Sequence, residues 1–141
     1  LKKLLEYDVV GAIIEPTASA LGNTNEDYYK EISNNNIPYL MINAAYDKDK
    51  QSYVAIDDEK GGYTICKYLI DLGHKDIAII TGSPNHYTSN GRLNGYKKAM
   101  TNAGLTITDD YIQCGDYCID GGYEAMMRLC KQKKPTSHIH Q

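Results

Sequence analysis

The stretch Ile77-Ala-Ile-Ile-Thr-Gly-Ser-Pro84, followed by Asn85-His-Tyr-Thr-Ser-Asn-Gly91 and then Arg92-Leu-Asn-Gly-Tyr-Lys-Lys-Ala-Met100, decides the fold. Its first part is apolar and β-branched and ends at a glycine and a proline, which predicts a buried strand. Its last part has apolar residues at helical spacing, which predicts a helix after a polar loop. Because ligands of open parallel sheets collect where strands end, we expect residues 82–92 to face a binding crevice.

Arg92 is the first candidate binding residue in this stretch. We expect it in the first turn of the helix, where the helix dipole disfavours a cation. That position indicates a task other than helix stability, and ligand binding is the natural one. A solvated surface arginine is the alternative.

Composition and motifs exclude several classes of protein. The 141 residues are 42% apolar, which suits one domain or two small lobes with a real core, and the net charge of −3 lacks the basic excess of a self-sufficient nucleic-acid binder. The cysteine spacings fit neither zinc pairs nor a secreted disulfide scaffold, so we interpret the four cysteines as free thiols in a reducing cytosol. The sequence contains no membrane-length apolar run, catalytic set, P-loop or dinucleotide fingerprint. We therefore predict no enzyme activity, no cofactor and no metal site.

The hydrophobic pattern predicts an alternation of strands and helices along the chain. Strands are expected at 9–15, 39–42, 53–56, 77–81 and 111–114. Helices are expected at 28–34, after the acidic residues 57–59 as far as residue 72, at 92–102 and at 122–131. The apolar residues Ile65, Leu69 and Leu72 should line the inward face of the second helix. The connection 44–52 has no helical stripe, so we expect it to pass directly between two lobes.

Further polar and aromatic side chains follow the expected strands and join Arg92 as candidates. They are Glu15 and Ser19 after the first strand, Asn43 after the second, Asp57 after the third and Tyr117 after the last. Hydrogen-bonding groups around an aromatic ring suit a neutral polyol or sugar, because every hydroxyl taken out of water needs a partner. Simpler roles remain open: Glu15 as a solvated strand end, Asp57 as a helix cap and Tyr117 as cover for the core.

Seven stretches carry a resemblance to a known family. In chain order they are Gly11-Ala-Ile-Ile-Glu-Pro16, Asn36-Ile-Pro-Tyr-Leu-Met-Ile-Asn43, Asp57-Asp-Glu-Lys-Gly-Gly62, Leu72-Gly-His74, Arg92-Leu-Asn-Gly-Tyr96, Gly115-Asp-Tyr117 and Pro135-Thr136. Together they resemble the effector-binding core of LacI/GalR-type transcriptional regulators. Residues 11–21 and 41–46 are most similar to the arabinose-responsive branch, in which a GntR-type winged-helix DNA-binding domain precedes this core.

The resemblance implies an α/β, periplasmic-binding-protein-like fold of two Rossmann-like parallel-sheet lobes, with a sugar in the cleft of a cytoplasmic homodimer. It implies that Arg92 hydrogen-bonds the effector and that the ring of Tyr117 packs on the sugar. Glu15 and Ser19 match a loop that often reaches the ligand, and Asn43 and Asp57 are further candidates.

The family's core is longer than this chain, so the resemblance implies an incomplete fragment. Residues 1–55 are expected to form part of the N-terminal lobe and residues 56–136 part of the C-terminal lobe. Residues 137–141 are expected to be an atypical tail that does not continue the strand after Pro135-Thr136.

The implied function is the ligand-sensing domain of a bacterial transcriptional repressor, with L-arabinose as the expected effector. Operator DNA would be bound through a DNA-binding domain absent from this chain. The alternative is an extracytoplasmic sugar-binding protein that feeds a transporter.

Overall fold

The computed structural model describes residues 2–15, 25–43, 52–84, 86–131 and 137–140. The chain divides into two compact units, Leu1–Ile56 and Asp57–Gln141, which are described separately.

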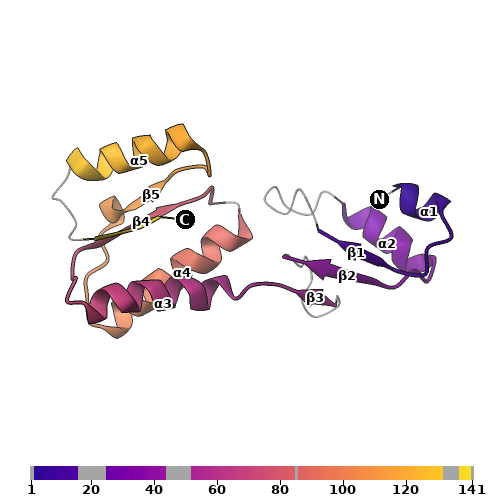
Figure 1. Cartoon of the computed structure of the whole chain (residues 1–141), viewed down its shortest axis with the longest axis horizontal. Coiled ribbons are helices and arrows are strands. Elements are labelled where there is room, and N and C mark those ends of the chain that lie inside the picture. The colour runs from indigo at the N-terminus through magenta and orange to yellow at the C-terminus, as the bar shows by residue number, and fades with distance from the viewer. Residues whose placement is uncertain (1, 16–24, 44–51, 85, 132–136, 141) are drawn as a thin grey trace. The chain divides into compact units, whose positions relative to one another are not determined.

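Unit 1 is built on a parallel three-stranded sheet (Figure 1). Its elements are α1 (Lys2–Glu6), β1 (Ala12–Ile14), α2 (Glu26–Asn34), β2 (Tyr39–Ile42) and β3 (Tyr53–Val54). The strands lie in the order β1-β2-β3, with Ala12 opposite Tyr39 and Met41 opposite Tyr53. Since β2 and β3 belong to one sheet, the predicted passage between lobes at 44–52 is wrong, and the chain leaves unit 1 only after Ile56.

The core of unit 1 lies between its sheet and α2. Ile14 of β1 and Met41 of β2 pack with Tyr29 and Ile32 of α2, all of them buried. Tyr29 and Ile32 therefore form the inward face of the helix predicted at 28–34. Their spacing of three residues places them on one side of the helix, as the period of 3.6 requires.

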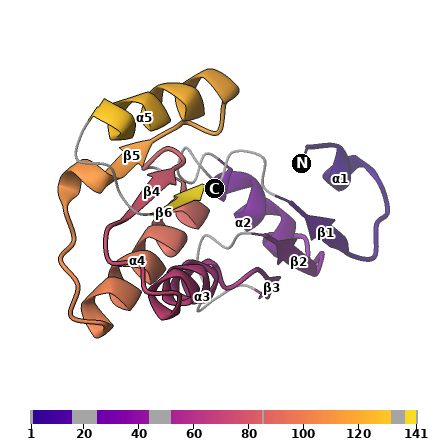
Figure 2. The same ribbon diagram turned by 60° about the vertical axis from the view of Figure 1, so that its left-hand side comes forward.

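Unit 2 is a three-layered α/β structure around a second parallel sheet. Its elements are α3 (Asp58–Asp71), β4 (Ile77–Thr81), α4 (Tyr87–Asn102), a 3₁₀ turn (Asp109–Tyr111), β5 (Ile112–Cys114), α5 (Ile119–Lys131) and β6 (Ser137–His140). The strand order is β5-β4-β6, so that β4 is central. Figures 1 and 2 show α5 on one face of this sheet and α3 with α4 on the other.

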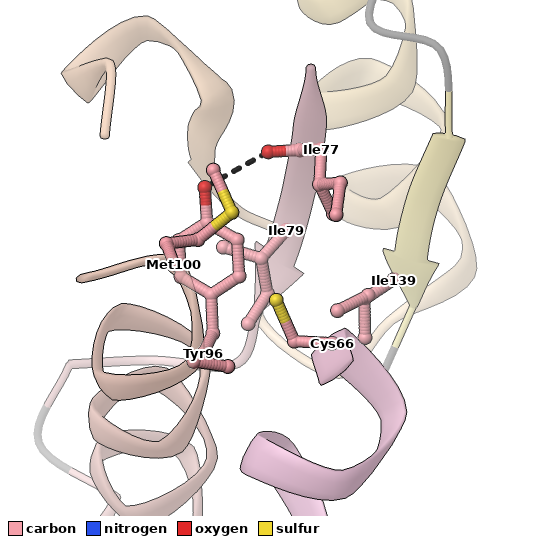
Figure 3. Packing of buried hydrophobic residues seen from close by; sticks show 7 residues of the cluster. Cys66, Ile77, Ile79, Tyr96, Met100 and Ile139 are labelled. Atoms are coloured by element: carbon pink, nitrogen blue, oxygen red, sulfur yellow. Dashed lines mark hydrogen bonds between the residues drawn. The ribbon is translucent and has the colours of Figure 1, made fainter. Parts of the chain in front are cut away.

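The central strand β4 is buried along its whole length because both faces are covered. Ile77 and Ile79 point toward α3 and α4, whereas Ala78 and Ile80 pack against α5. Figure 3 shows the first of these clusters, in which the buried hydroxyl of Tyr96 donates a hydrogen bond of 2.8 Å to the carbonyl oxygen of Ile77. This bond ties α4 to the start of the strand.

Residues 137–140 belong to the fold, so the prediction of an atypical tail is wrong for them. They form β6, which pairs in parallel with β4, with Ser137 opposite Ile77 and His140 opposite Ile80. Ile139 is 7% exposed and packs in the cluster of Ile79 and Cys66. A segment with a single isoleucine can form a strand here because β4 pairs with β5 on one side only and leaves its other edge for β6.

The helices α3 and α4 approach each other closely through glycines. A Cβ atom built on Gly62 would lie 2.8 Å from both the Cα and the carbonyl carbon of Arg92, and one built on Gly95 would lie 2.5 Å from the amide nitrogen of Tyr63. Real Cβ atoms essentially never come closer than 3.0 Å to such atoms. Both positions therefore require glycine at this separation of the helices.

This packing also explains why the inward face predicted for α3 is wrong in part. Ile65 and Leu72 are 45% and 60% exposed, whereas Cys66 is fully buried and only Leu69 of the predicted stripe contacts the core. The close approach to α4 at Gly62 turns the helix so that Cys66 enters the core instead of Ile65.

Candidate functional site

The carboxyl ends of β4 and β5 meet in unit 2. The amide of Gly115, which follows β5, donates a hydrogen bond of 2.7 Å to the carbonyl oxygen of Thr81, the last residue of β4. Gly82 follows Thr81 directly, and Tyr117 lies two residues after Gly115. This edge is where a doubly wound sheet binds its ligands.

Tyr117 lies across this edge. A Cβ atom on Gly82 would run into its ring, so glycine makes room for the aromatic side chain. The phenol oxygen lies 2.6 Å from Oγ of Ser89 and 3.2 Å from Oγ1 of Thr88, both in the first turn of α4. The imidazole ring of His86 lies 5.1 Å from the ring of Tyr117, tilted by 51°. Tyr117 as a residue is 47% exposed, so its side chain is partly open to solvent.

The loop that carries Tyr117 has an unusual backbone. Asp116 and Tyr117 have φ values of +54° and +58°. The left-handed region is uncommon for residues other than glycine, and two such residues in a row must be held by their surroundings. Strain of this kind gathers at functional sites.

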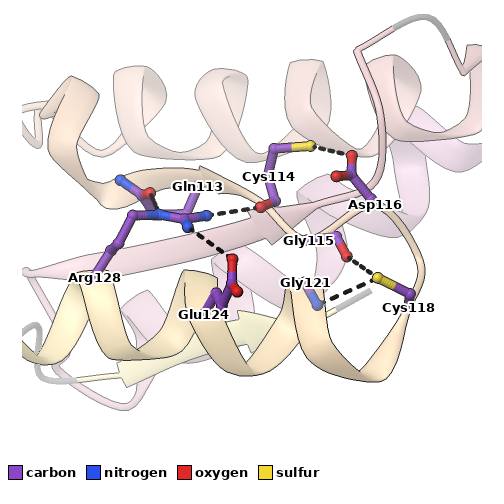
Figure 4. A network of polar contacts seen from close by, with 8 residues as sticks. All are labelled: Gln113, Cys114, Gly115, Asp116, Cys118, Gly121, Glu124 and Arg128. Atoms are coloured by element: carbon purple, nitrogen blue, oxygen red, sulfur yellow. Dashed lines mark hydrogen bonds and ion pairs between the residues drawn. The ribbon is translucent and has the colours of Figure 1, made fainter.

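Polar contacts on both sides of the loop supply that support (Figure 4). The thiol of Cys114 donates to Oδ1 of Asp116 at 3.0 Å, and the amide of Gly121 donates to the sulfur of Cys118 at 3.2 Å. Burial, together with the bond to Asp116, raises the pKa of the Cys114 thiol above its ordinary value, so this donor stays protonated. Arg128 of α5 donates through Nη2 to the carbonyl oxygen of Cys114 at 3.0 Å, which fastens the helix to the end of β5.

A pocket of about 360 Å³ opens beside Tyr117. It is lined by the end of β4, the loop with Tyr117 and the first turns of α5, and its walls are mainly apolar. Tyr117 therefore separates this pocket from the first turn of α4.

Arg92 lies in the second turn of α4, because the helix begins at Tyr87. The predicted position in the first turn is therefore wrong, and the argument from the helix dipole does not apply. Its Nε atom donates to Oδ1 of Asp58 at 2.8 Å; the side chain of Asp58 is 6% exposed and that of Arg92 is 35% exposed.

Asp57 acts as the N-cap of α3. Its Oδ1 atom accepts a hydrogen bond of 2.9 Å from the amide of Lys60. The capping role is thus confirmed, and it occupies one carboxylate oxygen of this candidate.

Glu15 and Asn43 come together in unit 1. Asn43 donates through Nδ2 to Oε1 of Glu15 at 2.9 Å, and both side chains are exposed at the carboxyl ends of β1 and β2. Asn43 has a φ of +64°, a conformation that asparagine tolerates better than most residues. Ser19 lies outside the described residues.

Sequence reasoning missed the partners of the candidates. Asp58, Ser89 and His86 hold Arg92 or Tyr117, yet each is separated from its partner by about thirty residues in the chain. The glycines at 62, 91 and 95 were the one available signal, because they mark where α3 and α4 approach.

Comparison with known proteins matches residues 7–140 to the family described as periplasmic binding proteins and sugar binding domain of the LacI family. The chain belongs to this family. Its periplasmic-binding-protein-like fold with parallel sheets confirms the fold class predicted from the sequence. In the described part of this LacI-family chain, no helix is both long and apolar enough to cross a membrane.

Among its relatives are several repressors. The chain is 37% identical over 112 residues to the arabinose metabolism transcriptional repressor of Halalkalibacterium halodurans, which covers 79% of this chain and 30% of that protein. It is 40% identical over 105 residues to the HTH-type transcriptional repressor PurR of Glaesserella parasuis, and this match covers 74% of this chain and 31% of that protein. The solved structure of a transcription regulator from Lactobacillus plantarum superposes with a TM-score of 0.83 at 30% identity over 98% of this chain and 50% of that one. The chain thus spans less than a third of either curated relative and half of the solved chain.

Proposed function

We propose that this chain is the ligand-sensing domain of a bacterial transcriptional repressor and that its effector is a sugar, with L-arabinose as the first candidate. The similarity to an arabinose metabolism repressor supports the choice of sugar. The similarity to the PurR repressor is of the same order, so the sugar is decided by experiment.

The observation that carries the proposal is the arrangement of Tyr117 and Arg92 around the first two turns of α4. Tyr117 is anchored by its hydroxyl to Ser89 and is partly exposed, and among the described residues Arg92 is held only through its Nε atom. A pyranose or furanose has an apolar face that packs on an aromatic ring and hydroxyls that need hydrogen-bond partners. The ring anchored at the first turn of α4 offers the apolar contact, and the arginine in the second turn of the same helix offers hydrogen-bond donors.

Glu15, Ser19, Asn43 and Asp57 complete the proposed set of ligand residues. Glu15 and Asn43 provide a carboxylate and an amide at one strand edge of unit 1, and such groups accept and donate to hydroxyls. Among the described residues, the cap bond of Asp57 uses only its Oδ1 atom.

The ligand would act by preferring one arrangement of the protein over another, because only a difference in affinity shifts such an equilibrium. We propose that the cytoplasmic protein works as a homodimer and that operator DNA is bound through a domain outside this chain.

Calorimetric titration of the complete gene product with L-arabinose, D-xylose, D-ribose and D-galactose tests the proposal. We expect saturable heat with L-arabinose and weaker binding of the other sugars. Arg92→Ala should lose the heat while its circular dichroism spectrum is retained, and Lys97→Ala, an exposed cation on the same helix, should bind like the wild type. Absence of heat with all four sugars contradicts the proposal.

A sugar-binding protein of a transporter is the second candidate, since the family to which the chain belongs also includes periplasmic binding proteins. Such a protein would bind sugar at the same site but would not bind DNA. A gel-shift assay of the complete gene product with the DNA upstream of its own gene separates the two: sugar-dependent retardation supports the repressor, and sugar binding without retardation supports the transporter protein.

A further inference from the structure

The ion pair between Arg92 and Asp58 is unequal in its exposure. The carboxylate is almost fully buried, whereas about a third of the arginine side chain is exposed. A guanidinium group has five N–H donors in a fixed fork, and the bond to Asp58 uses only the one on Nε. Among the described residues, Nη1 and Nη2 have no hydrogen-bond partner.

Two glycines bring the partners within reach. A Cβ atom on Gly91 would lie 2.8 Å from Cβ of Asp58, and Gly62 lets the carbonyl group of Arg92 lie against α3. The close crossing of the helices therefore fixes the backbone of Arg92, and Asp58 fixes its side chain. Asp58 is itself the first residue of α3, where the helix dipole favours a carboxylate.

We propose that Asp58 is a positioning residue for ligand binding: it holds Nε of Arg92 so that Nη1 and Nη2 are presented together to a polar, hydroxyl-bearing ligand. This inference rests on the proposed sugar-sensing function. Arginine loses considerable rotamer entropy when it is ordered, and a side chain ordered before binding reduces that cost in the complex.

A second ion pair links the same two helices and provides a matched control. Lys98 of α4 donates to Oε1 of Glu59 of α3 at 2.8 Å. The side chain of Lys98 is 59% exposed and that of Glu59 is 47% exposed. An exposed pair contributes little, and this one does not involve Arg92. Removing Glu59 therefore perturbs the helix contact without releasing the arginine.

The test compares Asp58→Ala, Asp58→Asn and Glu59→Ala in the complete gene product, by calorimetric titration with L-arabinose and the three other sugars. Outer hydrogen-bond partners of metal ligands are worth roughly 10- to 100-fold in affinity, and we expect Asp58→Ala to weaken sugar binding by about tenfold. Asp58→Asn should restore most of the affinity, because its amide oxygen still accepts from Nε. Glu59→Ala should bind like the wild type.

A spectroscopic signal reports on the arginine directly. The Nε–Hε resonance of Arg92, identified in nitrogen-15 NMR spectra by its loss in Arg92→Lys, should persist in Asp58→Asn and Glu59→Ala and broaden or shift in Asp58→Ala. This signal is read without ligand, so it also follows the pair if no sugar binds.

Three outcomes overturn the inference. The first is unchanged affinity in Asp58→Ala. The second is an equal loss in folded Asp58→Asn and Asp58→Ala, which would assign the effect to charge rather than to position. The third is an equal loss in Glu59→Ala, which would assign it to the helix contact. If the wild type binds no sugar, the proposed function fails as well, and that result is distinct from all three.

Discussion

Replacing Gly62 by alanine tests the close contact of α3 and α4. The new methyl group would lie 2.8 Å from the Cα and carbonyl carbon of Arg92 and closer still to its carbonyl oxygen, where ordinary contacts lie at 3.4–4 Å. These atoms belong to the backbone of a helix and have no rotamer through which to escape. The helices must therefore separate, and α4 carries Tyr96 and Met100, which fill the core beneath it.

The expected loss follows from two opposing contributions. Overpacking costs about 1–3 kcal/mol, and contact with backbone places this site at the upper end. Alanine is about 1 kcal/mol better than glycine within a helix. We therefore expect Gly62→Ala to lower the free energy of unfolding by about 2 kcal/mol. At about 4–8 °C per kcal/mol for a unit of this size, the loss is readily seen in a melting curve.

The neighbouring residue supplies the control. A Cβ atom on Gly61 meets nothing within 4 Å, so Gly61→Ala should gain about 0.5–1 kcal/mol from helix propensity alone. Urea unfolding followed by far-ultraviolet circular dichroism compares the two variants. A Gly62→Ala protein as stable as Gly61→Ala would refute the close packing.

Three more changes probe individual groups. Burial raises the pKa of the Cys66 thiol to about 11 and that of the Tyr96 phenol to about 12, so the folded state keeps protons that the unfolded chain releases. The contribution of these two groups to the free energy of unfolding should therefore be fully present below about pH 9 and be lost as the pH rises toward 12. Urea unfolding at several pH values measures this loss, and Cys66→Ala should remove the part of it that occurs at the lower pH. Tyr117→Phe leaves the hydroxyl of Ser89, which is 1% exposed, without its partner at 2.6 Å, and should cost about 1–2 kcal/mol in the same assay. Asp57→Ala removes the cap of α3 and should cost about 1 kcal/mol in thermal unfolding, whereas Asp57→Asn should retain most of it.

Local periodicity was enough to predict most of the strands and helices of the two units, β6 being the clear exception. The apolar run before Gly82 forms β4, and the helical spacing after the polar loop belongs to α4, in which Tyr96 and Met100 are buried. Tyr117 follows a strand as predicted, because a turn signalled by a glycine after a short strand depends on neighbouring residues only. Features of this kind are determined within a few residues of chain.

Features that depend on distant partners could not be predicted in the same way. The start of α4 at Tyr87 lies in a segment of polar residues and a glycine, which have weak helix propensity, and it is held there by packing against α3 and by the bonds to Tyr117. The binding partner of Arg92 is 34 residues away, and nothing near Arg92 identifies Asp58. β6 forms because β4 has an open edge, which the four residues themselves do not reveal.

The place of β6 in the sheet also determines when unit 2 can fold. β4 follows α3 in the sequence, yet β6, one of its two neighbouring strands, begins some sixty residues later. Closing so long a loop slows folding, and on the ribosome the sheet stays open on one side until residue 140 has emerged. During that interval the edge of β4 and the site of Ile139 are exposed, so a nascent chain stalled before β6 is the form of this protein most prone to pair with another strand.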